Sequence, residues 1–171
     1  MSLTSVTEAD IRSVSLQLQR EARDIVAIAA RCICGNPIVV QTKPRLSDGT
    51  PFPTMYYLTL PAATAALSRL EAEGVMVELQ GRLAADEDFA KQYLNAHEQY
   101  LAERAKLGDV PEIEGISAGG MPTRVKCLHA LAGHALAAGP GVNLVGDAAL
   151  ELCSWKQNVC QCKPAIDVDV V

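Results

Sequence analysis

The pattern of apolar and polar positions predicts a chain built mainly from helices. Thr7 can cap the first helix, which has Val14 and Leu18 on its apolar face. That helix ends near Arg20. Asp86 can cap another helix, in which apolar side chains recur at helical spacing along one face. The same reasoning predicts further helices over residues 60–74, 75–85, 124–138 and 146–155.

Short apolar runs rich in β-branched residues predict strands at residues 25–31, 37–41 and 55–58. A turn containing Gly35 separates the first two, which therefore form a hairpin with Cys32 and Cys34 at its tip. The fold predicted from these elements is α+β, predominantly helical, with a small antiparallel sheet of about three short strands.

The length and composition of the chain favour a single domain over residues 1–171. With 49% hydrophobic residues the chain can bury a core without disulfides. Residues 108–122 are rich in Gly and Pro, so we expect a flexible connection there rather than a domain boundary. We also expect flexible ends at residues 1–6 and 163–171.

The net charge of −5 argues against general nucleic-acid binding. No apolar run reaches the length of roughly 18 residues that a membrane helix needs, and the N-terminus does not have the pattern of a secretory signal. We therefore expect a cytoplasmic protein that does not insert into a membrane. In that compartment thiols stay reduced, so the six cysteines indicate metal binding, redox chemistry or plain burial.

The predicted helix over residues 124–138 is apolar around almost its whole circumference, yet it carries Cys127, His129 and His134. Either these groups pack and bond to the backbone, or some of them bind a metal. Cys127 and His134 lie roughly 10 Å apart along an unbroken helix, which is too far for one zinc ion. Either a larger iron–sulfur cluster binds both, or one of them is a ligand and the other has a separate role. His129 can join Cys127 only if the helix begins later than residue 124.

Two pairs of cysteines have the spacing C-x-C. The hairpin pair, Cys32 and Cys34, is the better metal-binding candidate, because a tight turn can point both sulfurs the same way. The tail pair, Cys160 and Cys162, is the weaker one, since chain ends are poorly ordered unless something holds them. Bound metal would hold this tail, which also contains Cys153 and Trp155. We expect His97 to be exposed on the polar side of its helix.

A second chemistry is suggested by basic residues near a helix start. Arg45, Arg124 and Lys126 could bind a phosphate or carboxylate, with Asp48 nearby and His129 as general acid or base. This arrangement predicts an anion site of a phosphate-ester or nucleotide-handling enzyme. Neither of the common glycine-rich nucleotide motifs is present, and surface cations are frequent in any protein.

Four motifs stand out in combination: Arg31-Cys32-x-Cys34-Gly35-x-Pro37, Pro44-Arg45-Leu46-x-Asp48-Gly49-Thr50-Pro51-Phe52-Pro53-Thr54, Ser68-Arg69-Leu70-Glu71, and Val125-Lys126-Cys127-Leu128-His129 with His134. Together they resemble the uncharacterised, mostly actinobacterial domain-of-unknown-function family 501. The similarity runs from about residue 12 to residue 147.

The resemblance strengthens the metal hypothesis. Many relatives carry a Cys where this chain has Leu60. The resemblance implies that Cys34 replaces this Cys as a metal ligand. We therefore predict an iron–sulfur cluster or zinc bound by Cys32, Cys34 and Cys127, with His134 or a tail Cys completing the set, in redox sensing or as a structural staple. Relatives' genes tend to lie near those for enolase, a septum-formation initiator and an exopolyphosphatase. That neighbourhood implies a non-catalytic adaptor in cell division or envelope growth, with an unidentified protein partner.

Overall fold

A three-stranded antiparallel sheet forms one side of the molecule. The computed structural model describes residues 3–162, and in it the strands β1 (Ile25–Arg31), β2 (Pro37–Thr42) and β3 (Tyr56–Leu58) pair in the order β1-β2-β3. Val40 in the central strand is paired with Ile28 on one side and with Tyr57 on the other. The predicted hairpin and third strand are confirmed.

The remaining elements are helical, and their caps explain where several of them begin. Thr7 and Asp10 form the predicted capping box at the first helix, and the Asp86 side chain accepts from the amide of Phe89 at the fourth. The helices are α1 (Glu8–Leu18), α2 (Pro61–Ala72), α3 (Val75–Ala85), α4 (Glu87–Ala105), the 3₁₀ helix η1 (Pro111–Ile113), α5 (Leu128–Ala138) and α6 (Leu144–Leu152).

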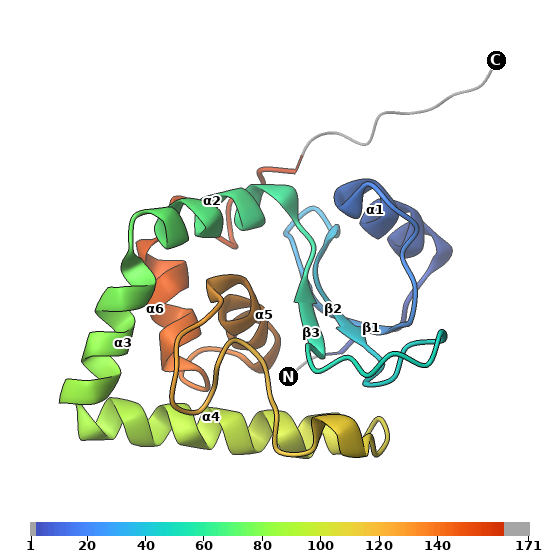
Figure 1. Ribbon diagram of the computed structural model, residues 1–171. Helices are drawn as coiled ribbons and strands as arrows, with labels where there is room; N and C mark the ends of the chain where they lie inside the picture. The colour runs from blue at the N-terminus through green and yellow to red at the C-terminus, as the bar shows by residue number, and fades with distance from the viewer. Residues whose placement is uncertain (1–2, 163–171) are drawn as a thin grey trace.

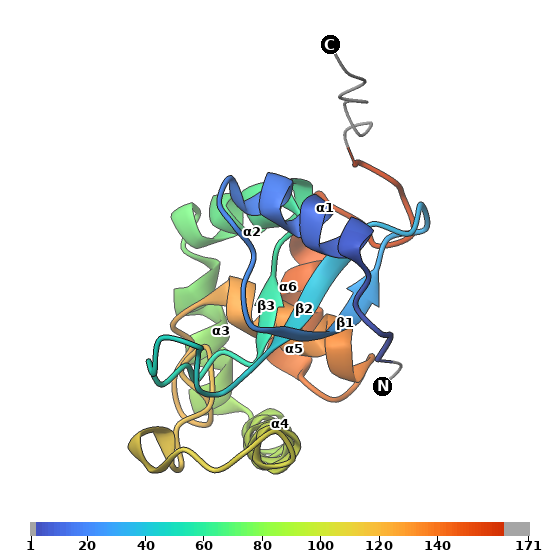
Figure 2. The ribbon, with the colours of Figure 1, turned by 90° about the vertical axis from the view of Figure 1, so that its right-hand side faces the viewer.

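The two faces of the sheet bury different cores. Helix α1 covers one face, where Val14 packs with Ile28 and Val40 in a small apolar cluster (Figure 2). Helix α5 covers the other face, and α2, α3 and α4 frame it together with α6 (Figure 1). Gly133 of α5 lies so close to the sheet that a Cβ there would be 3.0 Å from the Tyr56 carbonyl oxygen. The sheet and the helices α2, α3, α4 and α6 thus surround α5, which is the buried centre of the fold.

Helix α5 begins later than its sequence predicts, at Leu128 rather than at residue 124. The preceding segment is held by hydrogen bonds to other elements: Val125 donates its amide to Gln80 on α3, and Tyr93 on α4 donates to the Arg124 carbonyl. A Cβ at Gly120 would lie 2.6 Å from that same carbonyl oxygen, so the tight turn before the helix needs glycine. These tertiary contacts override the helical pattern.

Residues 108–122 are packed against the helices, which corrects the expectation of a flexible connection. The Arg104 guanidinium is buried and donates to the carbonyls of Ile113 and Ile116, which fastens this segment to α4. His97 is buried as well, and its Nδ1 lies 2.9 Å from the Ser117 hydroxyl. The prediction that His97 is exposed was wrong, because the 108–122 segment folds across the face of α4 that looked free in the sequence.

Both ends of the described chain contact the rest of the fold. Thr4, within the end for which we predict flexibility, forms an antiparallel bridge with Ile28. Cys153 and Trp155, after α6, are buried in the main core. The predicted flexible end at 163–171 lies outside the described residues. Among residues 3–162, none of the helices combines the length and the apolar character needed to cross a membrane.

Candidate metal centre

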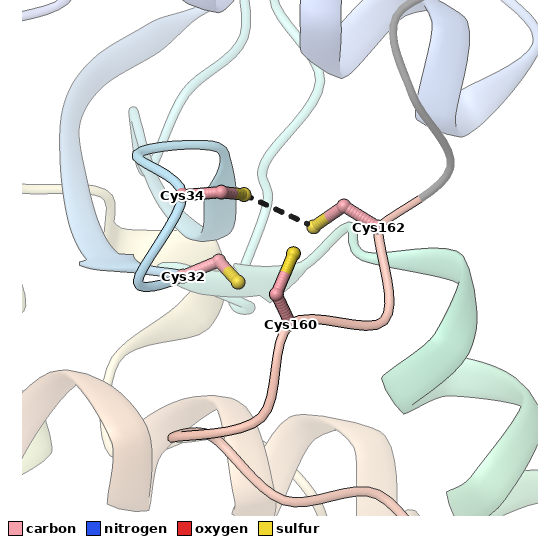
Figure 3. Close-up of side chains that lie close together, drawn as sticks. All are labelled: Cys32, Cys34, Cys160 and Cys162. Carbon is pink, nitrogen blue, oxygen red and sulfur yellow. Dashed lines mark hydrogen bonds between the residues drawn. The ribbon is translucent and has the colours of Figure 1, made fainter.

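Four cysteine sulfurs from opposite ends of the chain meet at the tip of the β1–β2 hairpin. Cys32 and Cys34 come from the hairpin, and Cys160 and Cys162 come from the segment after α6 (Figure 3). All four sulfur atoms lie within 4.8 Å of one another, and those of Cys34 and Cys162 are 3.5 Å apart. The two C-x-C pairs therefore converge on one point, with the sulfurs directed toward each other.

The hairpin turn prepares its two sulfurs for this arrangement. The turn is closed by hydrogen bonds from the Cys32 amide to the Asn36 carbonyl (2.9 Å) and from the Gly35 amide to the Cys32 carbonyl (2.8 Å). Gly35 adopts a φ of 90°, which favours glycine. The backbone amides of Cys34 and Asn36 donate to the sulfurs of Cys32 and Cys34, respectively, so an N–H group faces each sulfur.

The second pair reaches the hairpin because the chain after α6 is anchored just before it. Trp155 is 2% exposed, and the Cys153 thiol is buried and donates to the carbonyl oxygens of Leu150 and Trp155. The Lys156 ammonium donates to the carbonyl oxygen of Glu151, near the end of α6, at 2.7 Å. From this anchor the chain returns along the molecule to the hairpin, where it presents its two sulfurs (Figure 3).

The four thiols have different environments. Burial raises the pKa of Cys32 and raises that of Cys162 to about 12, whereas the backbone hydrogen bond from Asn36 is the main cause that lowers the pKa of Cys34 to about 7. Cys32 is buried, Cys162 is half-buried, and Cys34 and Cys160 are exposed. The cluster thus lies at the protein surface with one side in the core.

A second group of candidate ligands lies where α2 meets the start of α5. The His129 Nδ1 atom is 3.2 Å from a carboxylate oxygen of Glu71 and 4.0 Å from the Cys127 sulfur. The hydrogen bond between His129 and Cys127 is the main cause that raises the pKa of His129 to about 9. The same bond is the main cause that lowers the pKa of Cys127. The late start of α5 allows this: Cys127 is the extended N-cap residue, so it can approach a side chain two positions on.

His134 belongs to neither group. Its ring is 1% exposed, stacks on Tyr56 at 5.8 Å and meets Tyr100 edge-on at 5.1 Å. Its Nδ1 atom is 3.1 Å from the Asn143 side-chain nitrogen, and burial lowers its pKa to about 4. A neutral imidazole with an amide partner and two aromatic neighbours is a satisfied core histidine.

The predicted anion-binding residues are placed as follows. Arg45 is bound at 2.6 Å to Glu112 and at 2.8 Å to the Gly49 carbonyl, so its guanidinium already has an anionic partner. Arg124 and Lys126 are exposed in the segment before α5. Their common role in binding an anion stays a prediction.

The structure therefore divides the predicted metal ligands Cys32, Cys34, Cys127 and His134 among three places. The first two lie together, Cys127 is grouped with Glu71 and His129, and His134 is in the core. The tail pair, which the sequence ranked lower, supplies the partners of the hairpin pair. The signals available for it were the repeated C-x-C spacing and the nearby Trp155, an apolar anchor in an otherwise polar tail. Glu71 was not singled out as a ligand from the sequence.

Comparisons with known proteins identify a family but no individual relative. A family model described as "Protein of unknown function (DUF501)" matches residues 28–151. This range contains the hairpin pair and the Glu71–Cys127–His129 group, and it ends before the tail pair. No curated protein and no solved structure matches the chain.

Proposed function

We propose that this chain, which belongs to the DUF501 family of proteins of unknown function, binds one Zn²⁺ ion through the four cysteines of its two C-x-C pairs and uses it as a structural staple. The observation that carries the proposal is the convergence of sulfurs from Cys34 and Cys162, 128 positions apart in sequence. Four thiolates with no open position are the usual ligands of a structural zinc site.

The spacing of the sulfurs favours a single ion over an iron–sulfur cluster. A tetrahedral ion with metal–sulfur distances of about 2.3 Å holds its sulfurs about 3.8 Å apart. The sulfurs here, all within 4.8 Å and one pair at 3.5 Å, are close to that value. A cluster contains several iron atoms and bridging sulfides, so its cysteine sulfurs spread over a wider cage. Among single ions, tetrahedral four-sulfur coordination suits zinc.

The centre would stabilise the fold by joining the end of the chain to its first hairpin. In the chain-entropy model, a cross-link that closes a loop of more than 100 residues stabilises a protein by on the order of 4–5 kcal/mol. Without the ion, the segment from Gln157 to Cys162 has few other contacts, since five of its six residues are exposed. Loss of metal should therefore detach this segment first, while Trp155 stays in the core.

The test compares metal content and tail protection in matched variants. The wild type, purified anaerobically, should contain zinc, and Cys160→Ala should lose one equivalent, because Cys160 is exposed and contributes little else. Ser154→Ala is the control: it changes an exposed side chain of the same tail that takes no part in the cluster. Trypsin should cleave after Lys156 faster in Cys160→Ala and in chelator-treated wild type than in the control.

Three results would count against the proposal. Equal metal content in Cys160→Ala and the wild type would contradict a metal centre formed by the four cysteines. Iron with acid-labile sulfide in place of zinc would favour a cluster. A wild type that contains no metal and resists trypsin equally with and without chelator would mean that packing alone holds the tail.

A further inference from the structure

Beyond the four-cysteine centre, the geometry points to a second metal site, in which Glu71, Cys127 and His129 bind one Zn²⁺ and leave its fourth position open to water or a small anion. The three ligand atoms, one oxygen, one sulfur and one nitrogen, lie within 4.8 Å of one another. None of them belongs to the first cluster, so this inference does not depend on the proposed function.

The hydrogen bonds of His129 fix which nitrogen would bind the ion. Its Nε2 atom is 3.1 Å from the Thr64 carbonyl oxygen, which can only accept, so Nε2 carries the hydrogen. An incoming ion would therefore displace the proton on Nδ1, which is the atom that faces Glu71 and Cys127. A histidine that donates one ring N–H to a backbone carbonyl and offers the other nitrogen is the usual arrangement in metal sites.

The distances agree with one ion among the three donors. With ligand distances of about 2.0–2.3 Å, a tetrahedral zinc ion separates nitrogen from oxygen by about 3.4 Å and nitrogen from sulfur by about 3.6 Å. The structure has 3.2 Å and 4.0 Å for these pairs. Thiolate and carboxylate together bring two negative charges, which a divalent cation balances. A single proton can bridge only one pair of these donors, whereas an ion contacts all three.

Helix α2 and the start of helix α5 position the three donor atoms. Thr64 and Glu71 lie on one face of α2, seven residues apart, and Ser68 between them is 3.2 Å from the His129 ring. The Leu128 amide at the start of α5 donates to Glu71 at 2.7 Å and orients its carboxylate. The ligands are thus held before any ion arrives, as a binding site requires.

The site is open to solvent on one side, unlike a closed structural centre. The side chains of Glu71 and His129 are 25% and 26% exposed, and Cys127 is half-buried. Three protein ligands and one exchangeable position are typical of zinc sites that bind or activate a small ligand, whereas four cysteines are typical of structural ones. The chain would then carry one site of each kind.

Cobalt binding tests this site in a chain that lacks the first one. On the background Cys34→Ser/Cys162→Ser, the metal-free full chain should bind one equivalent of Co²⁺, with a thiolate-to-cobalt charge-transfer absorption that Zn²⁺ abolishes by competition. Adding Cys127→Ser should remove that absorption. Adding Glu71→Gln should weaken Co²⁺ binding by at least about 100-fold, more than loss of an indirect partner would. Glu73→Gln, at the exposed residue that follows α2 directly, is the control and should bind as the background does.

Absence of Co²⁺ binding in the folded background variant would overturn the inference, as would charge-transfer absorption that survives Cys127→Ser. Thermal unfolding of each metal-free variant establishes that it folds. Alkylation of Cys127 by iodoacetamide gives a second measurement: saturating Zn²⁺ should slow it at least about 10-fold in the wild type. An unchanged rate would leave Cys127 as a thiolate paired with His129 without metal, and would contradict the site.

Discussion

The close packing of α6 on α5 gives a quantitative test of the fold, because Gly146 leaves no room for a side chain. A Cβ there would lie 2.2 Å from the Leu131 carbonyl oxygen and 2.8 Å from the Ala135 Cβ. An ordinary contact needs about 3.5 Å, so Gly146→Ala would have to move α6 by about 1 Å. Such overpacking costs about 1–3 kcal/mol or more, which exceeds the gain of up to about 1 kcal/mol from helix propensity.

We therefore expect Gly146→Ala to lower the free energy of unfolding by about 2 kcal/mol and the Tm by about 4–8 °C. Gly81→Ala is the matched control, since Gly81 is an exposed residue inside α3 with nothing within 4 Å of its Cβ position. That variant should gain about 0.5–1 kcal/mol. Urea unfolding followed by the fluorescence of Trp155 measures both. Equal stability of Gly146→Ala and the wild type would refute the close approach of the two helices.

Three further predictions concern buried polar groups. Hydrogen bonds from Arg31 are the main cause that lowers the pKa of Asp10, so the stability they contribute is present above about pH 4 and is lost as the pH falls further. Asp10→Asn should therefore lower the free energy of unfolding by about 2 kcal/mol at pH 7 and by much less at pH 3, as measured by urea midpoints. The pKa of His134, lowered to about 4 by burial, predicts a ring whose NMR signals do not titrate between about pH 8 and pH 5, and stability that declines below about pH 6.5; a midpoint near 6.5 would contradict its burial. Tyr100→Phe removes the hydroxyl to which the buried Met55 amide donates and leaves that amide its bond to the Pro53 carbonyl oxygen, so it should lower the free energy of unfolding by about 0.5–1.5 kcal/mol in the same urea assay; wild-type stability would contradict the bond to Tyr100.

Local signals in the sequence were sufficient for most of the elements but not for those that tertiary contacts decide. The capping box of Thr7 and the cap at Asp86 set their helices correctly, because both act within one helical turn. The helix that the sequence predicts from residue 124 begins instead at Leu128. Gln80, far away in the sequence, binds the segment in between through its side chain. A pattern of residues on one helix contains no information about such a partner.

The candidate site shows the same division between local and distant information. The hairpin placed Cys32 and Cys34 together, which depends only on a short turn. Their partners, Cys160 and Cys162, lie in a tail that Trp155 anchors in the core, a contact between distant parts of the chain. Cys127 and His134 do lie in different places, but Cys127 is the extended N-cap of α5 and not a residue of an unbroken helix, as the spacing argument had assumed. The condition under which His129 could join Cys127, a late helix start, is met in the structure.

X-ray absorption at the zinc edge tests the central claim most directly. The sample is the Cys127→Ser chain, in which the second site lacks its sulfur and the four-cysteine centre is intact. The account predicts one zinc ion per chain, surrounded by four sulfur atoms at about 2.3 Å. Zinc bound mainly through nitrogen and oxygen, or a chain that retains no zinc, would contradict it.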